Sequence, residues 1–294
     1  MTRLPAGSAH LAPGAAHGSP GLAERTGDPI YAHRLLGEWR RAWREARRIV
    51  LMLDFDGTLA PIASRPEAAR MLPRARSALA RLAGDATVHL AVVSGRALAD
   101  VRALVGLPEI AYAGNHGLEL AWNGREEIHP AADAARPALQ RALGRLTAEL
   151  ASVEGVQVED KGLTLSVHYR RAAPAAEPFV RGVVRRSVDS GTGLRITEGK
   201  KVVEVRPSVA WDKGRAVEFL RARFAPPPLA PILYLGDDAT DEDAFLAVAR
   251  HPGGAGILVA KELPPTTAAH AHLRSPADTA RFLHTLAEPS DPLA

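Results

Sequence analysis

An apolar run that ends in two acidic residues constrains the fold of this chain more than any other feature. Residues 49–53 have the continuous apolar pattern of a buried strand, and the sequence DFDGT follows at 54–58. Because side chains alternate along a strand, Asp54 and Asp56 point to the same side where the chain leaves the sheet. Two neighbouring carboxylates repel each other unless a cation lies between them or one keeps a proton. A divalent metal ion would satisfy them and attract phosphate, although Asp and Gly are also common in ordinary turns.

The composition limits the classes of protein that the chain can represent. With 294 residues, 46% of them hydrophobic, it is long enough for one large domain or two modest ones. The sequence has no cysteine, which excludes disulfides and a cysteine nucleophile and fits a reducing compartment. A net charge of +4 suits a small anionic substrate. Because no apolar run approaches the roughly 20 residues of a membrane helix and no secretory signal is recognisable, we expect a cytoplasmic protein without a membrane partner.

The N-terminal part of the chain predicts an extension followed by a basic helix. Residues 1–28 are rich in Ala, Gly, Pro and His without periodicity, which predicts a disordered extension. Residues 31–48 have a helical pattern, with two tryptophans on one face and several arginines on the others. A basic helix can bind nucleic acid or a membrane surface, but Glu38 and Glu45 interrupt the charge. We therefore interpret the arginines as a solvated face and expect no nucleic-acid partner.

The order of predicted elements indicates a parallel sheet that an insertion interrupts. Strands are expected at 49–55, 87–93, 110–113, 232–235 and 256–259, and helices at 72–82, 98–105, 213–224, 241–250 and 276–286. Apolar strands that alternate with helices are typical of an α/β fold with a parallel, Rossmann-like sheet covered on both faces. Between the two halves, the pattern is strand 118–122, helix 132–150, strands 156–158 and 163–170, helix 177–187, and strands 194–197 and 201–206. We therefore expect an α+β cap domain at 118–206 and a catalytic core at 29–117 and 207–290.

Three further segments place polar residues near the first motif. The sequence SGR follows a predicted strand at 94–96, Lys213 opens a helix, and GDDATDE spans 236–242. Each feature alone is ordinary, since Ser-Gly turns, surface lysines and acids at a helix start are all common. The carboxyl ends of parallel strands, however, lie along one edge of a sheet, where ligands bind in such folds. The topology therefore predicts that Asp54, Ser94 and Asp237 lie close together.

With these four segments the chain resembles the haloacid dehalogenase-like phosphatases, and within them the trehalose-phosphate branch. The matching motifs are DFDGTLAPI, SGR, DKG and GDDATDE, together with GNHG at 114–117, and the resemblance covers roughly residues 48–287. It implies a Mg²⁺-dependent phosphatase that releases trehalose from trehalose 6-phosphate through an aspartyl-phosphate. Two alternatives stay open at this point. One is a phosphatase for another sugar phosphate, and the other is a catalytically silent domain that binds a sugar phosphate.

The resemblance also implies roles for residues of the core. Asp54 would be the nucleophile, and Asp56 would protonate the leaving sugar oxygen and then deprotonate water. Ser94 and Lys213 would hold the phosphoryl oxygens. The metal residues that it implies are Asp54, Asp56 through its backbone carbonyl, Asp237 and Asp238, with Asp241 as nearby support.

Alternation in the predicted cap indicates a sheet with one polar face. Apolar and polar residues alternate in 163–170 and again in 200–206, a pattern that solvent exposure alone would also explain. The resemblance implies that a sugar phosphate is the small-molecule partner, and it leaves a trehalose-phosphate synthase open as a protein partner. The substrate-binding residues that it implies in the cap are Lys161, His168, Arg170, Lys200 and Glu204. Arg96, Asn115 and His116 are further substrate-binding candidates in the core, although a glycine-flanked turn would also explain Asn115 and His116.

Overall fold

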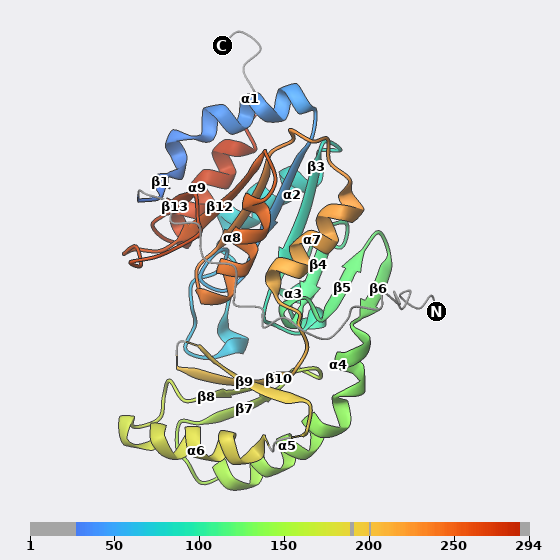
Figure 1. The fold of residues 1–294 in the computed structure, drawn as a ribbon. Helices are drawn as coiled ribbons and strands as arrows, with labels where there is room; N and C mark the ends of the chain where they lie inside the picture. The colour runs from blue at the N-terminus through green and yellow to red at the C-terminus, as the bar shows by residue number, and fades with distance from the viewer. Residues whose placement is uncertain (1–27, 189–190, 200, 289–294) are drawn as a thin grey trace.

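The structure, a computed structural model, describes residues 28–188, 191–199 and 201–288 (Figure 1). The extension predicted at 1–28 therefore lies outside the described residues, except for Asp28. Within them, nine strands form one large sheet, namely β1 (Ile30–Tyr31), β2 (Ile49–Leu53), β3 (Val88–Val93), β4 (Ala111–Gly114), β5 (Glu119–Trp122), β6 (Arg125–Ile128), β11 (Ile232–Gly236), β12 (Gly254–Val259) and β13 (Ala271–Leu273). Their spatial order is β1-β13-β12-β11-β2-β3-β4-β5-β6, and the pairs from β1 to β4 are parallel.

Helices cover both faces of this sheet. One face packs against α1 (Leu36–Ala46), α2 (Pro73–Ala83), α3 (Leu98–Val105) and α9 (Pro276–Leu286), and the other against α7 (Lys213–Phe224) and α8 (Glu242–Ala249). All five residues of β2 are buried, as a strand with helices on both sides requires. The predicted α/β fold with a Rossmann-like parallel sheet is thereby confirmed. Among the described residues, no helix has the length and apolar character needed to cross a membrane.

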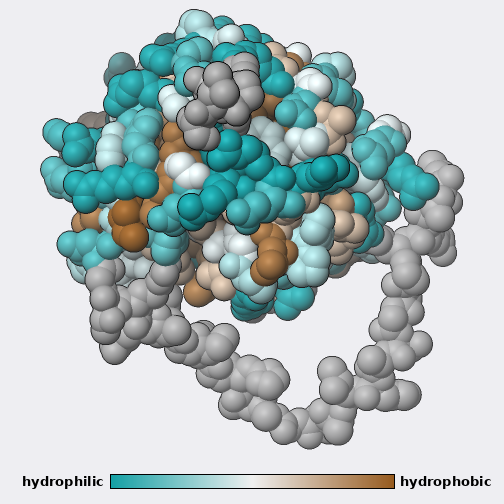
Figure 2. Space-filling model, turned by 90° about the horizontal axis from the view of Figure 1, so that it is seen from above, coloured by the Kyte–Doolittle hydropathy of each residue, from teal (hydrophilic) through white to brown (hydrophobic). Residues whose placement is uncertain are grey.

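The basic helix α1 lies across the end of the core that is uppermost in Figure 1. Its Trp39 and Trp43 pack against the core, whereas Arg41 and Arg44 are exposed. Seen from above in Figure 2, hydrophilic side chains predominate over this end of the molecule. This arrangement agrees with the interpretation of the arginines as a solvated face.

A second, smaller sheet forms the cap. Its strands are β7 (Gln157–Asp160), β8 (Leu165–His168), β9 (Leu194–Gly199) and β10 (Val202–Pro207), in the antiparallel order β7-β8-β10-β9. Helices α5 (Arg136–Leu150) and α6 (Glu177–Ser187) pack against one face and enclose an apolar core, and the short α4 (Pro130–Ala134) precedes them. The sheet lies between these helices and the large domain (Figure 1). Its other face is therefore turned towards the core.

The strand pairing corrects the expected start of the cap at residue 118. β5 pairs antiparallel with β4 and β6 pairs with β5, so 119–128 extend the large sheet rather than the cap. β6 was not predicted because its sequence, Arg-Glu-Glu-Ile, is charged and mostly exposed, as is usual for a strand at a sheet edge. β1 and β13 were also missed, since strands of two and three residues are too short to show alternation.

Candidate active site

The polar motifs of the core meet along one edge of the large sheet. Asp54 follows β2, Ser94 follows β3 and Asp237 follows β11, and these three strands are parallel neighbours. Asp54 is 4% exposed and Ser94 is 1% exposed. A cleft between this edge and the cap sheet is lined by residues of both domains, including Asp54, Lys213 and Glu204. The predicted proximity of the three motifs is therefore observed.

A buried lysine joins the acidic residues of this edge. Lys213 Nζ lies 3.1 Å from Asp54 Oδ1 and 2.7 Å from Asp241 Oδ1, and its side chain is 3% exposed. Burial alone would lower the pKa of Lys213, but Asp241 and Asp54 outweigh it and raise the pKa well above its usual value. Burial also raises the pKa of Asp54, and Lys213 lowers it only in part, so that the pKa stays well above its usual value. Lys213 is therefore a fixed cation, and Asp54 still lies in surroundings that favour a further positive charge.

Asp241 organises the loop after β11. Its Oδ1 accepts hydrogen bonds from Lys213 Nζ at 2.7 Å and Tyr234 Oη at 2.6 Å. Its Oδ2 accepts from the backbone N–H groups of Asp237 at 3.0 Å and Asp238 at 3.1 Å. Since four donors already occupy this fully buried carboxylate, Asp241 is better suited to orient its neighbours than to coordinate a metal ion itself.

The same region has the composition of a divalent metal site. Carboxylate oxygens of Asp54, Asp237 and Asp241 lie within 4.8 Å of one another. Gly57 has φ +78°, and a Cβ at this position would lie 2.2 Å from the carboxylate of Asp237. Only glycine therefore allows the Asp237 side chain to approach the loop that follows β2. An oxygen-only donor set of this kind suits Mg²⁺, so the residues fit the metal that the sequence predicted.

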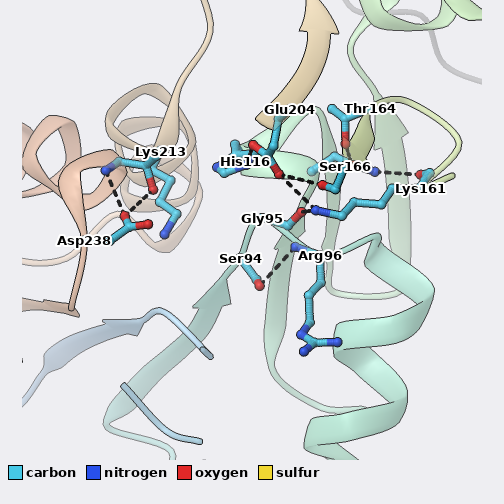
Figure 3. Close-up of polar contacts among 12 residues, drawn as sticks. Ser94, Gly95, Arg96, His116, Lys161, Thr164, Ser166, Glu204, Lys213 and Asp238 are labelled. Atoms are coloured by element: carbon cyan, nitrogen blue, oxygen red, sulfur yellow. Dashed lines mark hydrogen bonds and ion pairs between the residues drawn. The ribbon is translucent and has the colours of Figure 1, made fainter. Parts of the chain in front are cut away.

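The side chains of Asp56 and Asp238 face other partners. Arg96 donates to Asp56 Oδ2 through Nε at 2.7 Å and to Asp56 Oδ1 through Nη2 at 2.9 Å. Asp238 Oδ1 accepts from the N–H of Thr240 at 2.8 Å and from its hydroxyl at 2.7 Å, and so caps a short helical turn. Neither carboxylate belongs to the cluster around Asp54. Arg96, predicted to bind substrate, lines the cleft and is paired with Asp56, and in Figure 3 its side chain points away from Lys161 and Glu204.

Four polar residues meet where the cap touches the core (Figure 3). Lys161, Glu204 and His116 were predicted as site residues, and Ser166 was not. Lys161 Nζ donates to the backbone oxygen of Gly95 and to Glu204 Oε1, both at 3.0 Å. Ser166 Oγ donates to Glu204 Oε1, and His116 Nε2 lies 3.0 Å from Glu204 Oε2. The loop that holds Ser94 is therefore in direct contact with the cap.

Burial and charge determine the protonation of this cluster. Burial lowers the pKa of His116 to about 4, so its ring is neutral at pH 7. Burial alone would raise the pKa of Glu204, but its cationic surroundings, with Lys161 first among them, hold it well below the usual value. Because His116 is neutral, Lys161 is the contacting charge that keeps Glu204 ionised. Glu204 therefore faces the cleft as a carboxylate that accepts hydrogen bonds.

The remaining predicted residues are distributed around the cleft. His168 Nε2 lies 2.7 Å from Glu159 Oε2, and both residues line the cleft, as does the exposed Arg170. Asn115 is fully buried and hydrogen-bonded to protein groups. Lys200 lies outside the described residues. Glu159 was missed because it lies in a strand whose sequence, Gln-Val-Glu-Asp, shows little alternation, whereas Ser166 shares the predicted polar face of β8.

A parallel sheet with acidic loops at its carboxyl edge and a capping sheet above them defines a haloacid dehalogenase-like fold. The C-terminal domain of the Candida albicans trehalose-6-phosphate phosphatase has the same fold, with a TM-score of 0.75 and 25% sequence identity, over 88% of this chain and 97% of that one. The family model for trehalose-phosphatase matches residues 52–278. This chain belongs to the trehalose-phosphatase family.

Relatives with curated descriptions are similar over most of this chain. A trehalose-phosphate phosphatase of Mycobacterium marinum is 43% identical over 245 residues, and one of Mycobacterium avium is 45% identical over 250 residues. Each alignment covers 82% of this chain, but only 62% and 63% of the respective relatives. The chain thus spans less than two thirds of the length of these relatives.

Proposed function

We propose that this chain is a Mg²⁺-dependent phosphatase that hydrolyses trehalose 6-phosphate to trehalose and phosphate. Membership of the trehalose-phosphatase family supports the reaction and the substrate. The observation that carries the proposal is the 3.1 Å contact between buried Lys213 and Asp54, below a cap face that presents Glu204 and Lys161. A chain without cysteine suits a reducing compartment, so we propose the cytoplasm as its location. A trehalose-phosphate synthase is the protein partner that we propose in addition.

The proposed first step transfers the phosphoryl group to Asp54. A carboxylate oxygen of Asp54 forms a bond to phosphorus while the bond from phosphorus to the sugar oxygen breaks. Lys213 is placed to neutralise charge on the phosphoryl oxygens, which is the main requirement of such a reaction. Ser94 Oγ accepts from the N–H of Arg96 at 3.2 Å, which leaves the hydroxyl proton available for a phosphoryl oxygen.

Asp56 is the proposed acid and base. It gives a proton to the departing sugar oxygen, and in the second step it takes one from the water that attacks the aspartyl-phosphate. In the structure Arg96 holds both carboxylate oxygens of Asp56. The acid role therefore requires Asp56 to leave Arg96 and turn towards the leaving oxygen. With 39% of its side chain exposed, Asp56 has room to do so.

The residues proposed to hold Mg²⁺ are Asp54, Asp237 and the backbone carbonyl of Asp56. When bound, the ion supplies positive charge at the phosphoryl oxygens and at the ionised Asp54. This charge suits the site, because burial among acids disfavours the anionic form of Asp54. Lys213 alone does not offset that effect.

Phosphate release from a panel of sugar phosphates, with Mg²⁺ or with EDTA, tests this proposal. The panel contains trehalose 6-phosphate, sucrose 6-phosphate, mannosyl-3-phosphoglycerate and glucose 6-phosphate, and Asp54→Asn is the inactive control. We expect trehalose 6-phosphate to be the best substrate and EDTA to remove turnover. A better rate with another sugar phosphate would transfer the assignment to that substrate. No Mg²⁺-dependent turnover on any would favour a silent binding domain.

A further inference from the structure

The side-chain amide of Asn115 is directed entirely at protein groups. Asn115 has φ +48° and is fully buried at the start of the turn η3 (Asn115–Gly117), between the core strands β4 and β5. Its Nδ2 donates to the backbone oxygen of Lys161 at 3.0 Å and to Glu119 Oε2 at 2.9 Å. Its Oδ1 accepts from Thr164 Oγ1 at 2.6 Å. Both donors of the amide are therefore used within the protein, which leaves none for a substrate.

Glu119 extends this network to the phosphate loop. Its Oε2 also accepts from the N–H of Leu98 at 2.8 Å, an otherwise unsatisfied donor at the first residue of α3. The backbone makes two further links, from Asn115 N to Arg96 O at 2.6 Å and from His116 N to Ser94 O at 2.8 Å. The segment that carries Asn115 is therefore held firmly against the loop of residues 94–96.

On the cap side, the network reaches the loop of residues 161–164 between β7 and β8. Leu163 is fully buried and packs with Leu118 and Ala132 at the junction of the two domains. Thr164 is also fully buried, and Arg136 Nη1 donates to Gly162 O at 3.3 Å. The base of this loop therefore lies within the junction, although its strands belong to the cap.

We propose that Asn115, Glu119 and Thr164, here named the junction clip, are positioning residues that fix Lys161 relative to the phosphate loop. The clip holds the backbone of Lys161, while Nζ of the same residue reaches Gly95 O at 3.0 Å. A flexible lysine is thereby presented to the cleft with little freedom left to lose on binding. Asn115 then acts through Lys161 and does not touch the substrate. This inference rests on the proposed function, in which Lys161 contacts the sugar phosphate.

Thr164→Val and Thr164→Ser form the matched pair that tests the clip. Valine keeps the shape of threonine but lacks the hydroxyl that donates to Asn115, whereas serine keeps that hydroxyl. We expect Thr164→Val to lower kcat/KM for trehalose 6-phosphate about tenfold and to change that for p-nitrophenyl phosphate less than about twofold. For both substrates, kcat/KM of Thr164→Ser should stay near the wild-type value. The same is expected of the control Thr147→Val, which changes an exposed threonine of α5. An equal loss on both substrates would show that Thr164 is merely structural.

A double-variant cycle tests whether the clip acts through Lys161. In a Lys161→Ala background, Thr164→Val should cause no further loss on the sugar phosphate, because the residue that it positions is gone. If the loss in kcat/KM of the double variant equalled the product of the losses of the two single variants, the proposal would be overturned. Should Thr164→Val fail to fold, Glu119→Met and its conservative partner Glu119→Gln serve the same cycle, since the glutamine oxygen can still accept from Asn115 and Leu98.

A readout without substrate separates this inference from the proposed function. Lys161 has a side chain only 9% exposed, so its acetylation by acetic anhydride should be slow and can be followed by peptide mass spectrometry. We expect Thr164→Val to speed acetylation of Lys161 several-fold while leaving the exposed Lys201 unchanged. Unchanged reactivity of Lys161 would contradict the clip even if trehalose 6-phosphate is the substrate. Faster labelling in a protein inactive on trehalose 6-phosphate would support the clip and reject the function.

Discussion

The two halves of the cleft hold their charged groups in different ways. In the core, Asp54 and Asp237 leave neighbouring parallel strands, and Asp241 is fixed by four donors, two of them backbone N–H groups. In the cap, Glu204 is held by the side chains of Lys161, Ser166 and His116. Strand ends and backbone donors thus help to set the geometry of the core site, whereas Glu204 of the cap is held by side chains alone, one of them from the core residue His116.

This difference indicates a division of labour between the two halves. Phosphoryl transfer needs charges held in fixed places, which strand ends and backbone donors provide. Hydrogen bonds between cap side chains can be exchanged for bonds to sugar hydroxyls without leaving a buried group unpaired. We therefore assign the chemistry to the core and the selection of the substrate to the cap.

The largest effect is expected at the core nucleophile. Asp54→Asn should lower kcat for every phosphate ester by at least about 10⁴-fold, because an amide cannot form the acyl phosphate. Initial rates of phosphate release with trehalose 6-phosphate and p-nitrophenyl phosphate measure this loss. Asp133→Asn, an exposed aspartate of α4, is the control that should leave both rates unchanged. A residual activity of a few per cent would mean that Asp54 is not the nucleophile.

The next effect concerns the core acid. Asp56→Asn should lower turnover of trehalose 6-phosphate by about 10²–10⁴-fold, the usual contribution of proton transfer to a poor leaving group. The loss should be smaller for p-nitrophenyl phosphate, whose leaving group needs little protonation. Comparing kcat for the two esters in the same preparation tests this point. Equal losses would count against Asp56 as the acid.

A smaller and more selective effect is expected in the cap. Glu204→Gln keeps the size of the side chain but removes the charge that pairs with Lys161. We expect kcat/KM for trehalose 6-phosphate to fall by about 10- to 100-fold, with less than about a threefold change for p-nitrophenyl phosphate. Glu149→Gln, a half-exposed glutamate of α5, is the matched control. A parallel fall on both esters would assign Glu204 a structural role instead.

The smallest effect is on stability and depends on pH. Burial lowers the pKa of His116 from 6.5 to about 4. Below pH 6.5, His116 therefore binds a proton in the unfolded chain but stays neutral in the folded protein until the pH approaches 4. The free energy of unfolding should therefore fall by about 2 kcal/mol from this residue between pH 7 and pH 5. Urea unfolding of the wild type and of His116→Gln measures the difference.

The pH window separates His116 from its partner. The pKa of Glu204 is held below its ordinary 4.5, so its stabilising contribution is lost only at a pH below that value. Measurements between pH 7 and pH 5 therefore report on His116 and not on Glu204. If the variant and the wild type lost stability in parallel over this range, His116 would not be the neutral buried group that the cap contacts require.

The sequence predicted most of the core because local patterns decide it. The helices at 98–105 and 213–224 were predicted with the bounds that the structure has, since apolar periodicity and flanking strands determine them. β6 and the short β1 and β13 could not be predicted in this way. A strand at a sheet edge is defined by its neighbour, and its own residues need not alternate.

The same limit applies to the candidate site. The motifs predicted that Asp54, Ser94 and Asp237 converge, because parallel strands share their carboxyl edge. Alternation also placed Glu204 on the polar face of its strand. That Arg96 pairs with Asp56, and that Lys161 reaches Gly95, depends on how segments distant in sequence pack together. No local pattern carries that information.

The central claim is that the core performs the chemistry and the cap selects the substrate. The most direct test is kcat/KM of the double variant Lys161→Ala/Glu204→Ala, in which both members of the ion pair are removed so that neither charge is left buried alone. With Mg²⁺ present, we predict a loss of at least about 100-fold for trehalose 6-phosphate and less than about threefold for p-nitrophenyl phosphate. Equal losses on the two esters, or no loss on either, would contradict the division of labour between core and cap.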